Sequence, residues 1–320
     1  MSTLRLGSRG SELALFQARL VARLIAESGG PSVEILVIKT SGDRLQDRPL
    51  SEVGGKRLFV KEIEDALLRN EIDLAVHSSK DMPAELPEGL GVAAVLPRED
   101  PADVVVLPSS VADSGTQEVS ARLRDARVGT GSVRRIAQLR RLFPTAIFEN
   151  IRGNLDTRLR KLDGGGYDAL VLAAAGMRRL GFGNRISWRI PEEDCIPAPG
   201  QGIIAVETRA DDFSVRNAVS TINDPDAAAA LEAERAVVTA LGGGCQMPIG
   251  ALAQIKDRTT LELRAIVASI DGTRAVRHVA SGSKSGAARL GRDVAAQLLK
   301  DGAREILADA SRIETQVPNH

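Results

Sequence analysis

The alternation of short apolar segments with amphipathic segments along the first two hundred residues constrains the fold of this chain most. Strands are expected at residues 4–7, 33–39, 72–76 and 91–96, and helices at residues 12–27 and 59–69. In the first of these helices, Leu13, Phe16, Leu20 and Leu24 recur on one face, and Ser11 is placed to cap it. Strands that alternate with helices in this way predict an open α/β sheet built largely from parallel strands.

A second series of strands and helices begins near Asp103. Strands are expected at residues 104–107, 126–128, 146–148 and 169–173, and helices at residues 133–142 and 155–162. The run Ala-Leu-Val-Leu-Ala at residues 169–173 is apolar throughout, which suits a strand buried on both faces. Residues 191–202 carry three Pro and two Gly and are expected to connect elements. Residues 203–207 then form a strand that could return to the first sheet.

The third region, from about residue 224, has a different pattern. A helix expected at residues 227–241 stops at Gly242-Gly243-Gly244-Cys245. Alternating segments at residues 249–255, 260–267 and 274–280 predict antiparallel strands, and residues 286–299 a closing helix. Three domains are therefore expected. They comprise residues 1–96 with 203–220, residues 102–196, and a small α+β domain at residues 225–320.

Charge and composition exclude several classes of protein. The 42 basic residues balance 42 acidic ones and aromatic residues make up only 2%, so the chain has neither a basic field nor stacking surfaces for nucleic acid. No apolar run approaches the roughly 18–20 residues of a membrane-spanning helix, and the N-terminus has no apolar signal segment. Two cysteines make a cytosolic protein with reduced thiols the default. No metal site is expected, because His77, His278 and His320 are not spaced with a cysteine as zinc requires.

Cys245 is a candidate for a chemical role because of its surroundings in the sequence. It follows a helix within a triple-glycine loop, whose backbone leaves room for a bulky group to approach. A covalent or ligand-binding role is one interpretation, and an inert loop thiol is the other. Cys195, in the Pro-rich connector, suits a structural role better.

A polar turn, His77-Ser78-Ser79-Lys80-Asp81, follows the apolar strand at residues 72–76. Open α/β sheets bind their ligands at the carboxyl ends of the strands, which makes Lys80 and Asp81 candidate site residues. The alternative is a surface loop that carries a solvated Lys–Asp pair.

Arginines recur where strands lead into loops and helices, in a chain with 34 Arg and 8 Lys. A glycine turn at residues 129–131 opens a helix with Arg134 and Arg135 in its first turn, and helix N-termini attract anions. Other arginines at such positions are Arg9, Arg152, Arg158, Arg178 and Arg179. A cleft lined with cations for a polycarboxylate explains this placement. GC-rich codons and solvated helix faces are the simpler alternatives.

Together these segments resemble one family, hydroxymethylbilane synthase, also called porphobilinogen deaminase. The matching segments follow the family's order at residues 5–18, 54–62, 73–83, 129–135, 152–159, 197–202 and 243–250. The resemblance implies two doubly wound α/β domains of the periplasmic-binding-protein type and a small C-terminal α+β domain with a three-stranded antiparallel sheet. It also implies a monomeric, cytoplasmic transferase with no nucleic-acid or membrane partner. Such an enzyme condenses four porphobilinogen molecules, with release of ammonia, into the linear tetrapyrrole hydroxymethylbilane.

The same resemblance implies roles for individual residues. A dipyrromethane cofactor is attached by a thioether to Cys245 and primes the growth of the chain. Asp81 matches the catalytic aspartate and Lys80 its neighbour in the site, and both also contact the cofactor. The remaining cofactor contacts are Ser132, Arg134 and Arg135. The substrate contacts are Arg9, Ser11, Gln17, Lys56, Arg152, Arg158 and Arg179. Because each pyrrole carries an acetate and a propionate, arginine forks on loops and helix starts suit the growing chain.

Two other interpretations of the same residues stay open. A two-domain solute-binding protein would hold an anionic ligand in a similar fold without chemistry, but it leaves Cys245 unexplained. A thiol hydrolase would pair Cys245 with His77 and would be inactivated by thiol-alkylating reagents. The mass of the purified protein separates these possibilities, because only the synthase carries a dipyrromethane beyond the 34.0 kDa of the chain.

Overall fold

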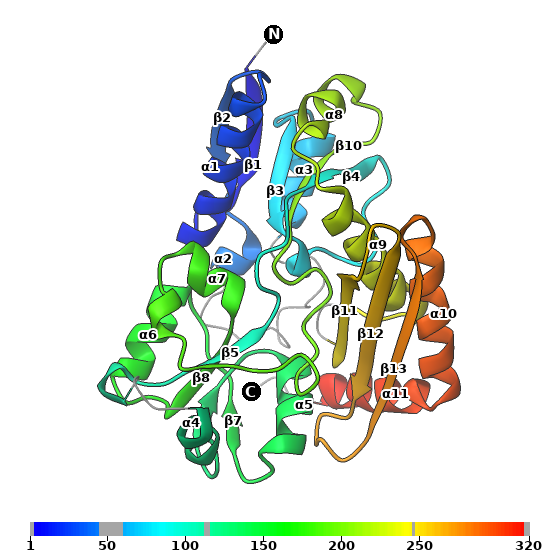
Figure 1. Cartoon of the computed structure of the whole chain (residues 1–320). Coiled ribbons are helices and arrows are strands. Elements are labelled where there is room, and N and C mark those ends of the chain that lie inside the picture. Colours follow the sequence, from blue (N-terminus) through cyan, green and yellow to red (C-terminus); the bar gives the residue numbers. More distant parts are fainter. Residues whose placement is uncertain (1–2, 45–59, 112–115, 245–246, 317–320) are drawn as a thin grey trace.

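The computed structural model describes residues 3–44, 60–111, 116–244 and 247–316. Three sheets organise these residues, two with five strands and one with three strands (Figure 1). We refer to the two five-stranded sheets with their helices as the first and second lobes, and to the three-stranded sheet with its helices as the third lobe. Lys56 and Cys245 lie outside the described residues. Within the described ranges, none of the helices combines the length and the apolar character that crossing a bilayer demands.

The sheet of the first lobe has the strand order β2-β1-β3-β10-β4. Its strands are β1 (Leu4–Ser8), β2 (Val33–Val37), β3 (Leu74–Ser78), β4 (Leu90–Val95) and β10 (Ile204–Arg209). As expected, β1 runs parallel to β2 and β3, and β10 returns to this sheet. The sequence analysis gave no direction for β10, which is antiparallel to β3 and β4. Ile204 pairs with Ser78, so the returning chain enters where β3 ends and has to run back along it.

Helices cover both faces of this sheet. On one face lie α1 (Glu12–Glu27) and α8 (Phe213–Ser220), and on the other lies α3 (Lys61–Leu68), while α2 (Ser41–Arg44) follows β2. Successive side chains of β3 separate the two cores: Leu74 and Val76 pack on the α1 side, and Ala75 packs on the α3 side. The expected cap of α1 is present, because Ser11 Oγ accepts a hydrogen bond from the N–H of Ala14 at 3.3 Å.

The second lobe repeats this plan with the strand order β7-β6-β8-β5-β9. Its strands are β5 (Asp103–Val106), β6 (Arg127–Gly129), β7 (Ile147–Glu149), β8 (Ala169–Ala173) and β9 (Trp188–Arg189). Its helices are α4 (Thr116–Arg122), α5 (Val133–Leu142), α6 (Leu155–Asp163) and α7 (Ala174–Arg179). Here β5 is the reversed strand, antiparallel to β8 and β9. The apolar strand β8 is buried on both faces as expected, with Leu170 on the α6 side and Val171 on the α5 side.

The third lobe contains the expected antiparallel sheet in the order β11-β12-β13. Its elements are α9 (Pro225–Ala240), β11 (Ile249–Ile255), β12 (Thr260–Ala268), β13 (Ala275–Ser283), α10 (Ala287–Lys300) and α11 (Ala303–Gln316). A Cβ at Gly291 would lie 2.3 Å from the carbonyl oxygen of Ala233, so α9 and α10 approach this closely only with glycine there. The sequence analysis missed α11, whose Ile306 and Leu307 pack into the core of this lobe.

Two segments, residues 96–102 and 196–203, connect the first two lobes, and the third lobe docks on them. Arg98 donates to the carbonyl oxygen of Gln201 at 2.8 Å and pairs with Glu234 of α9 at 2.5 Å. Glu234 also accepts a hydrogen bond from the N–H of Gly200 at 2.6 Å. At Gly202 (φ 89°) a Cβ would lie 2.2 Å from the carbonyl oxygen of Glu99, so the two connecting segments touch where only glycine fits. These contacts hold the three lobes around one junction. The expected domain boundaries stay a prediction.

Candidate active site

The polar turn after β3 lies at this junction. It forms a short 3-10 turn, η1 (Ser79–Asp81), and the N–H of Ser79 donates to the carbonyl oxygen of Ile203 at 3.0 Å. From α1, the buried Gln17 donates through Nε2 to Ser78 Oγ at 2.8 Å. The turn is therefore fixed by the connecting segment and by α1. It carries a half-buried Lys80 and an exposed Asp81 beyond the end of the sheet.

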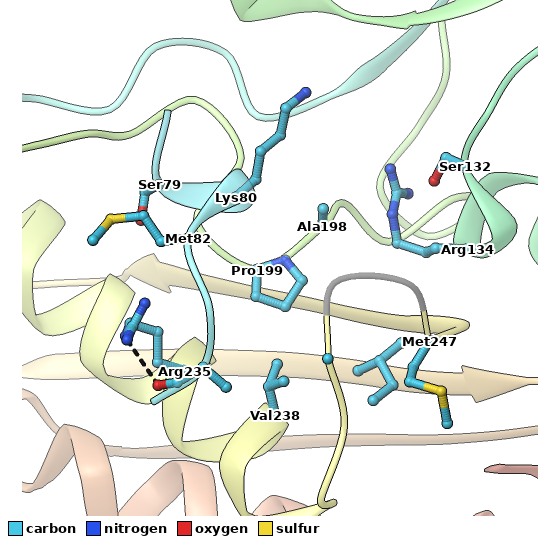
Figure 2. Close-up of a pocket in the computed structure, with 13 residues that line it drawn as sticks. Ser79, Lys80, Met82, Ser132, Arg134, Ala198, Pro199, Arg235, Val238 and Met247 are labelled. Atoms are coloured by element: carbon cyan, nitrogen blue, oxygen red, sulfur yellow. Dashed lines mark hydrogen bonds between the residues drawn. The ribbon is translucent and has the colours of Figure 1, made fainter. Parts of the chain in front are cut away.

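Lys80 has a positive electrostatic environment. Burial lowers its pKa to about 8, and Arg135 and Arg134 act in the same direction, whereas Asp81 and Asp103 oppose the shift. Figure 2 shows Lys80 and Arg134 on either side of Ala198 and Pro199 in the connecting segment. An amine from the first lobe thus lies within electrostatic reach of arginines from the second lobe.

Arg134 and Arg135 open α5 as expected, but neither side chain is free in the cleft. Both are buried and share the carboxylate of Asp103, with Arg134 Nη1 2.6 Å from Oδ2 and Arg135 Nε 2.9 Å from Oδ1. Arg134 Nη1 also donates to the carbonyl oxygen of Ile196 at 2.9 Å, and Arg135 Nη1 to that of Val171 at 2.9 Å. The pair is therefore held in place by the protein rather than extended into solvent.

Three more of the expected arginines carry pKa values below the ordinary range. Burial, with smaller contributions from Arg135 and Arg152, lowers the pKa of Arg158 to about 10 against the pull of Asp81. Burial also lowers the pKa of Arg152, and it lowers that of Arg179 to about 10 against the pull of Glu99. A depressed arginine pKa indicates a cation that has lost water without gaining a full counter-charge. An anionic ligand would supply that charge.

One pocket is bordered by all three lobes (Figure 2). The first lobe contributes Lys80, the second contributes Ser132 and Arg134, and the third contributes Gly244 and Met247. The remaining lining residues are Ser79, Met82, Ala84, Ala198, Pro199, Arg235, Val238 and Ile249. Since Gly244 and Met247 flank residues 245–246, the pocket lies beside the cysteine loop that the sequence analysis singled out.

A second pocket lies between the first two lobes. Its walls include Gln17 and Lys80 from the first lobe and Arg179 from the second. Arg179 Nη2 donates to the carbonyl oxygen of Gly202 at 2.7 Å, which fixes the side chain against the connecting segment. Lys80 borders both pockets, so the structure brings these three expected site residues together.

Not every expected residue lines these two pockets. Arg9 and Ser11 follow β1, and Ser11 Oγ caps α1, but neither residue borders either pocket. Asp81, Arg135, Arg152 and Arg158 do not line them either, but they form one electrostatic group with Lys80. The roles predicted for all of these residues stay predictions.

His77, which the thiol-hydrolase interpretation requires, and Cys195, for which a structural role was expected, are both buried. His77 is buried in the first sheet, with Nε2 3.0 Å from Glu207 Oε2, and it lines neither of the two pockets. A His77–Cys245 pair for a thiol hydrolase therefore has no support. Cys195 is buried beside Asp103, and burial together with Asp103 raises the pKa of its thiol to about 12. This agrees with the structural role expected for Cys195. Among the residues that the structure describes, no cluster could hold a metal ion.

The sequence analysis overlooked three residues around the junction. Asp103 was taken only as the start of the second series, although an acid directly before Val-Val-Val signals a buried charge that needs partners. Gln201 donates to Asp103 Oδ1 at 2.9 Å. Arg235 of α9 lines the first pocket and donates to the carbonyl oxygen of Ala84 at 2.7 Å (Figure 2). Arg235 lies within a long helical pattern, where nothing distinguishes it from a solvated arginine.

Family models and curated relatives that share one name match nearly the whole chain. The family model "Porphobilinogen deaminase, dipyromethane cofactor binding domain" matches residues 4–217, and "Porphobilinogen deaminase, C-terminal domain" matches residues 228–300. A relative from Syntrophobacter fumaroxidans named porphobilinogen deaminase is 48% identical over 310 residues, covering 97% of this chain and 98% of its own. One of the same name from Geobacter metallireducens is 46% identical over 312 residues, covering 97% and 96%. Among solved structures, an ancestral cationic amino acid solute binding protein matches 69% of this chain and 87% of its own, with 16% identity and a TM-score of 0.42.

Proposed function

The chain belongs to the porphobilinogen deaminase family, and we propose that Cys245 holds its dipyrromethane cofactor while Asp81 serves the chemistry. As a member of this family it is a transferase of tetrapyrrole biosynthesis that uses a dipyrromethane cofactor. It condenses porphobilinogen head to tail, with release of ammonia, and then releases hydroxymethylbilane. The assignments to individual residues are the proposal.

The observation that supports these assignments most is a group of desolvated cations that interact electrostatically with Arg135 and Asp81 at the junction. Lys80, Arg152 and Arg158 all have lowered pKa values, as expected for charged groups that await an anionic ligand. The Nε atoms of Arg134 and Arg152 are buried, and neither has a hydrogen-bond partner among the described residues. Every pyrrole of the cofactor and of the growing chain carries an acetate and a propionate. Arginine donors that lack an acceptor suit such carboxylates, so the residues present fit the cofactor.

We assign the chemical steps to the polar turn that follows β3. The bound cofactor supplies the pyrrole carbon to which the first substrate is joined. As ammonia leaves the substrate, positive charge develops on its pyrrole nitrogen, and Asp81 at the exposed tip of the turn would accept a hydrogen bond from that N–H and stabilise the charge. The same carboxylate can take up the proton that each coupling releases. Lys80 and Ser132, together with Arg134 and Arg135, would hold cofactor carboxylates.

The remaining assignments follow the resemblance. The proposed substrate contacts are Arg9, Ser11, Gln17, Lys56, Arg152, Arg158 and Arg179. We also propose that the enzyme is a cytoplasmic monomer without a nucleic-acid partner. The balance of 42 basic and 42 acidic residues supports the last point, because a nucleic-acid surface needs an excess of positive charge.

The mass of the intact protein tests the central assignment. The wild type should be heavier than the 34.0 kDa of the chain by one dipyrromethane. The variant Cys245→Ser should return to the chain mass and lose activity. Cys195→Ser is the matched control, because it removes the buried thiol and should keep the additional mass. An active wild type without added mass, or a Cys245→Ser variant that still carries it, would contradict the proposal.

The same preparation separates the alternatives. A solute-binding protein would show the chain mass and no ammonia release. A thiol hydrolase would be inactivated by iodoacetamide, whereas the assembled holoenzyme should resist the reagent because the sulfur of Cys245 is already bonded to carbon.

A further inference from the structure

Asp103 is a fully buried carboxylate that the proposed chemistry does not use directly. It is the first residue of β5, where the chain enters the second lobe from the first connecting segment. Both carboxylate oxygens are engaged by the arginines of α5. Arg134 reaches Oδ2 through Nη1 at 2.6 Å and Oδ1 through Nη2 at 3.2 Å, and Arg135 reaches Oδ1 through Nε at 2.9 Å and Nη2 at 2.8 Å.

The same carboxylate is tied to the second connecting segment. Gln201 donates through Nε2 to Asp103 Oδ1 at 2.9 Å and to the carbonyl oxygen of Pro101 at 2.6 Å. Cys195 Sγ donates to Oδ2 at 3.3 Å. Asp103 therefore joins the arginine pair to both chain segments that connect the lobes. A movement of these segments relative to α5 has to change this set of hydrogen bonds.

The charges of this group do not cancel. Burial alone would raise the pKa of Asp103, but Arg134 and Arg135 hold it well below its ordinary range, so the carboxylate stays ionised. One anion faces two cations, which leaves the group positive. Arg134 Nε also remains buried without an acceptor among the described residues, and Arg134 lines the pocket beside the cysteine loop. The group is thus rigid on the Asp103 side and keeps donor capacity for a ligand.

We propose that Asp103 is a positioning residue that fixes the guanidinium groups of Arg134 and Arg135 in the orientation that captures the cofactor carboxylates. This inference rests on the proposed function. The Asp103 carboxylate also offsets the repulsion between the two cations, so both can stay charged and buried next to the pocket. Through Gln201 it also links their orientation to the connecting segment at residues 196–203, where the carbonyl oxygen of Ile203 accepts a hydrogen bond from the N–H of Ser79 after β3.

A second aspartate, Asp73, also bridges two arginines but lies away from the two pockets, so it serves as a comparison for Asp103. Asp73 precedes β3, at the opposite end of the strand from the polar turn, and it also lies between two arginines. Arg5 Nη2 lies 2.8 Å from Asp73 Oδ1, and Arg209 Nη2 lies 3.6 Å from the same oxygen. None of these three residues lines either of the two pockets. Loss of a bridging carboxylate should lower the thermal midpoint at both positions, and more at the buried Asp103, whereas only the loss at Asp103 should impair cofactor loading.

The test compares Asp103→Asn and Asp103→Glu with Asp73→Asn in the full-length protein. Asparagine keeps the shape and one oxygen but removes the charge, whereas glutamate keeps the charge and moves it by one methylene. The readouts are the fraction of protein that carries the cofactor, from intact mass, the rate of cofactor acquisition when apoprotein is given porphobilinogen, and the thermal midpoint. The acquisition rate of Asp103→Asn should fall by about 10-fold to 100-fold. The acquisition rate of Asp103→Glu should lie between those of Asp103→Asn and the wild type. Asp73→Asn should acquire the cofactor fully even where its thermal midpoint is lower.

Each result of this test either supports or overturns the positioning role of Asp103. A folded Asp103→Asn that loads like the wild type overturns the proposal, and so does an equal loss of loading in Asp73→Asn. If Asp103→Asn does not fold, Asp103→Glu decides: slow loading in a folded variant supports positioning, and wild-type loading refutes it. A wild type that carries no cofactor at all would instead refute the function proposed for Cys245, and the two failures are therefore distinguishable.

Discussion

The first and second lobes share one architecture but bring opposite kinds of side chain to the junction. In the first lobe, the end of β3 carries an exposed acid, Asp81, on a short turn. In the second lobe, the start of α5 carries two buried arginines that Asp103 holds in place. The acid is exposed to solvent, whereas the cations are immobilised. The difference indicates a division of work, in which the first lobe acts on the reacting atoms and the second holds the carboxylates of a chain that has to move past that acid.

The strongest test of this division removes the acid. Asp81→Asn should lower turnover by about 10²-fold to 10⁴-fold, because a neutral amide neither stabilises a developing positive charge nor accepts its proton. The thermal midpoint should stay close to that of the wild type, since Asp81 is exposed. Ammonia release at saturating porphobilinogen is the measurement. Glu85→Gln, which neutralises an exposed acid near the same turn, is the control and should remain fully active. Normal turnover in Asp81→Asn would remove the acid from the mechanism.

The second test separates arginines that hold the fold from arginines that await a ligand. Arg134→Leu leaves Asp103 without one of its partners and should lower the free energy of unfolding by about 3–5 kcal/mol. Arg158→Leu should leave that free energy unchanged or raise it, because burial already disfavours the Arg158 cation, yet it should raise the KM for porphobilinogen. Urea unfolding and steady-state kinetics provide the two measurements.

Arg127→Leu is the control for this pair. Arg127 is exposed and pairs with Glu149 at 3.1 Å, so its replacement should change the free energy of unfolding by no more than about 1 kcal/mol and leave KM unaltered. If all three substitutions behaved alike, the many arginines of this chain would reflect codon composition rather than a site, and the contrast between the lobes would lose its meaning.

Local sequence patterns predicted the elements well and their long-range relations poorly. The predicted ranges of α5 and β8 are confirmed residue for residue, because amphipathic spacing and an uninterrupted apolar run are properties of neighbouring residues. The direction of β10 was not predicted, since it depends on where the chain re-enters the sheet. The burial of Arg134 was missed for a similar reason: its partner Asp103 lies 31 positions earlier, and no periodicity connects the two. Strand-end position brought Lys80 and Arg179 to one pocket, whereas Gln17, which lies within α1, was expected there only from the family resemblance.

The smallest expected effect concerns Lys80, a cation of the first lobe that borders both pockets. Its pKa of about 8 means that the amine loses its charge as the pH rises past that value, so its attraction for carboxylates should weaken there. In the wild type, the KM for porphobilinogen should rise by about fivefold between pH 7 and pH 9 relative to Lys80→Met. Taking the ratio of the two proteins cancels any titration of the substrate itself.

The effect of Lys80 on stability has the opposite sign. Its folded pKa, about 8, lies below the ordinary value of 10.5, so the unfolded state binds the proton more tightly. Below about pH 8 the charged amine opposes folding in full, and this penalty disappears as the pH rises toward 10.5. Wild-type stability should therefore rise with pH relative to Lys80→Met, while its affinity for porphobilinogen falls. A flat difference in both measurements would show that Lys80 is an ordinary solvated amine, and the polar turn after β3 would then offer the substrate an acid alone.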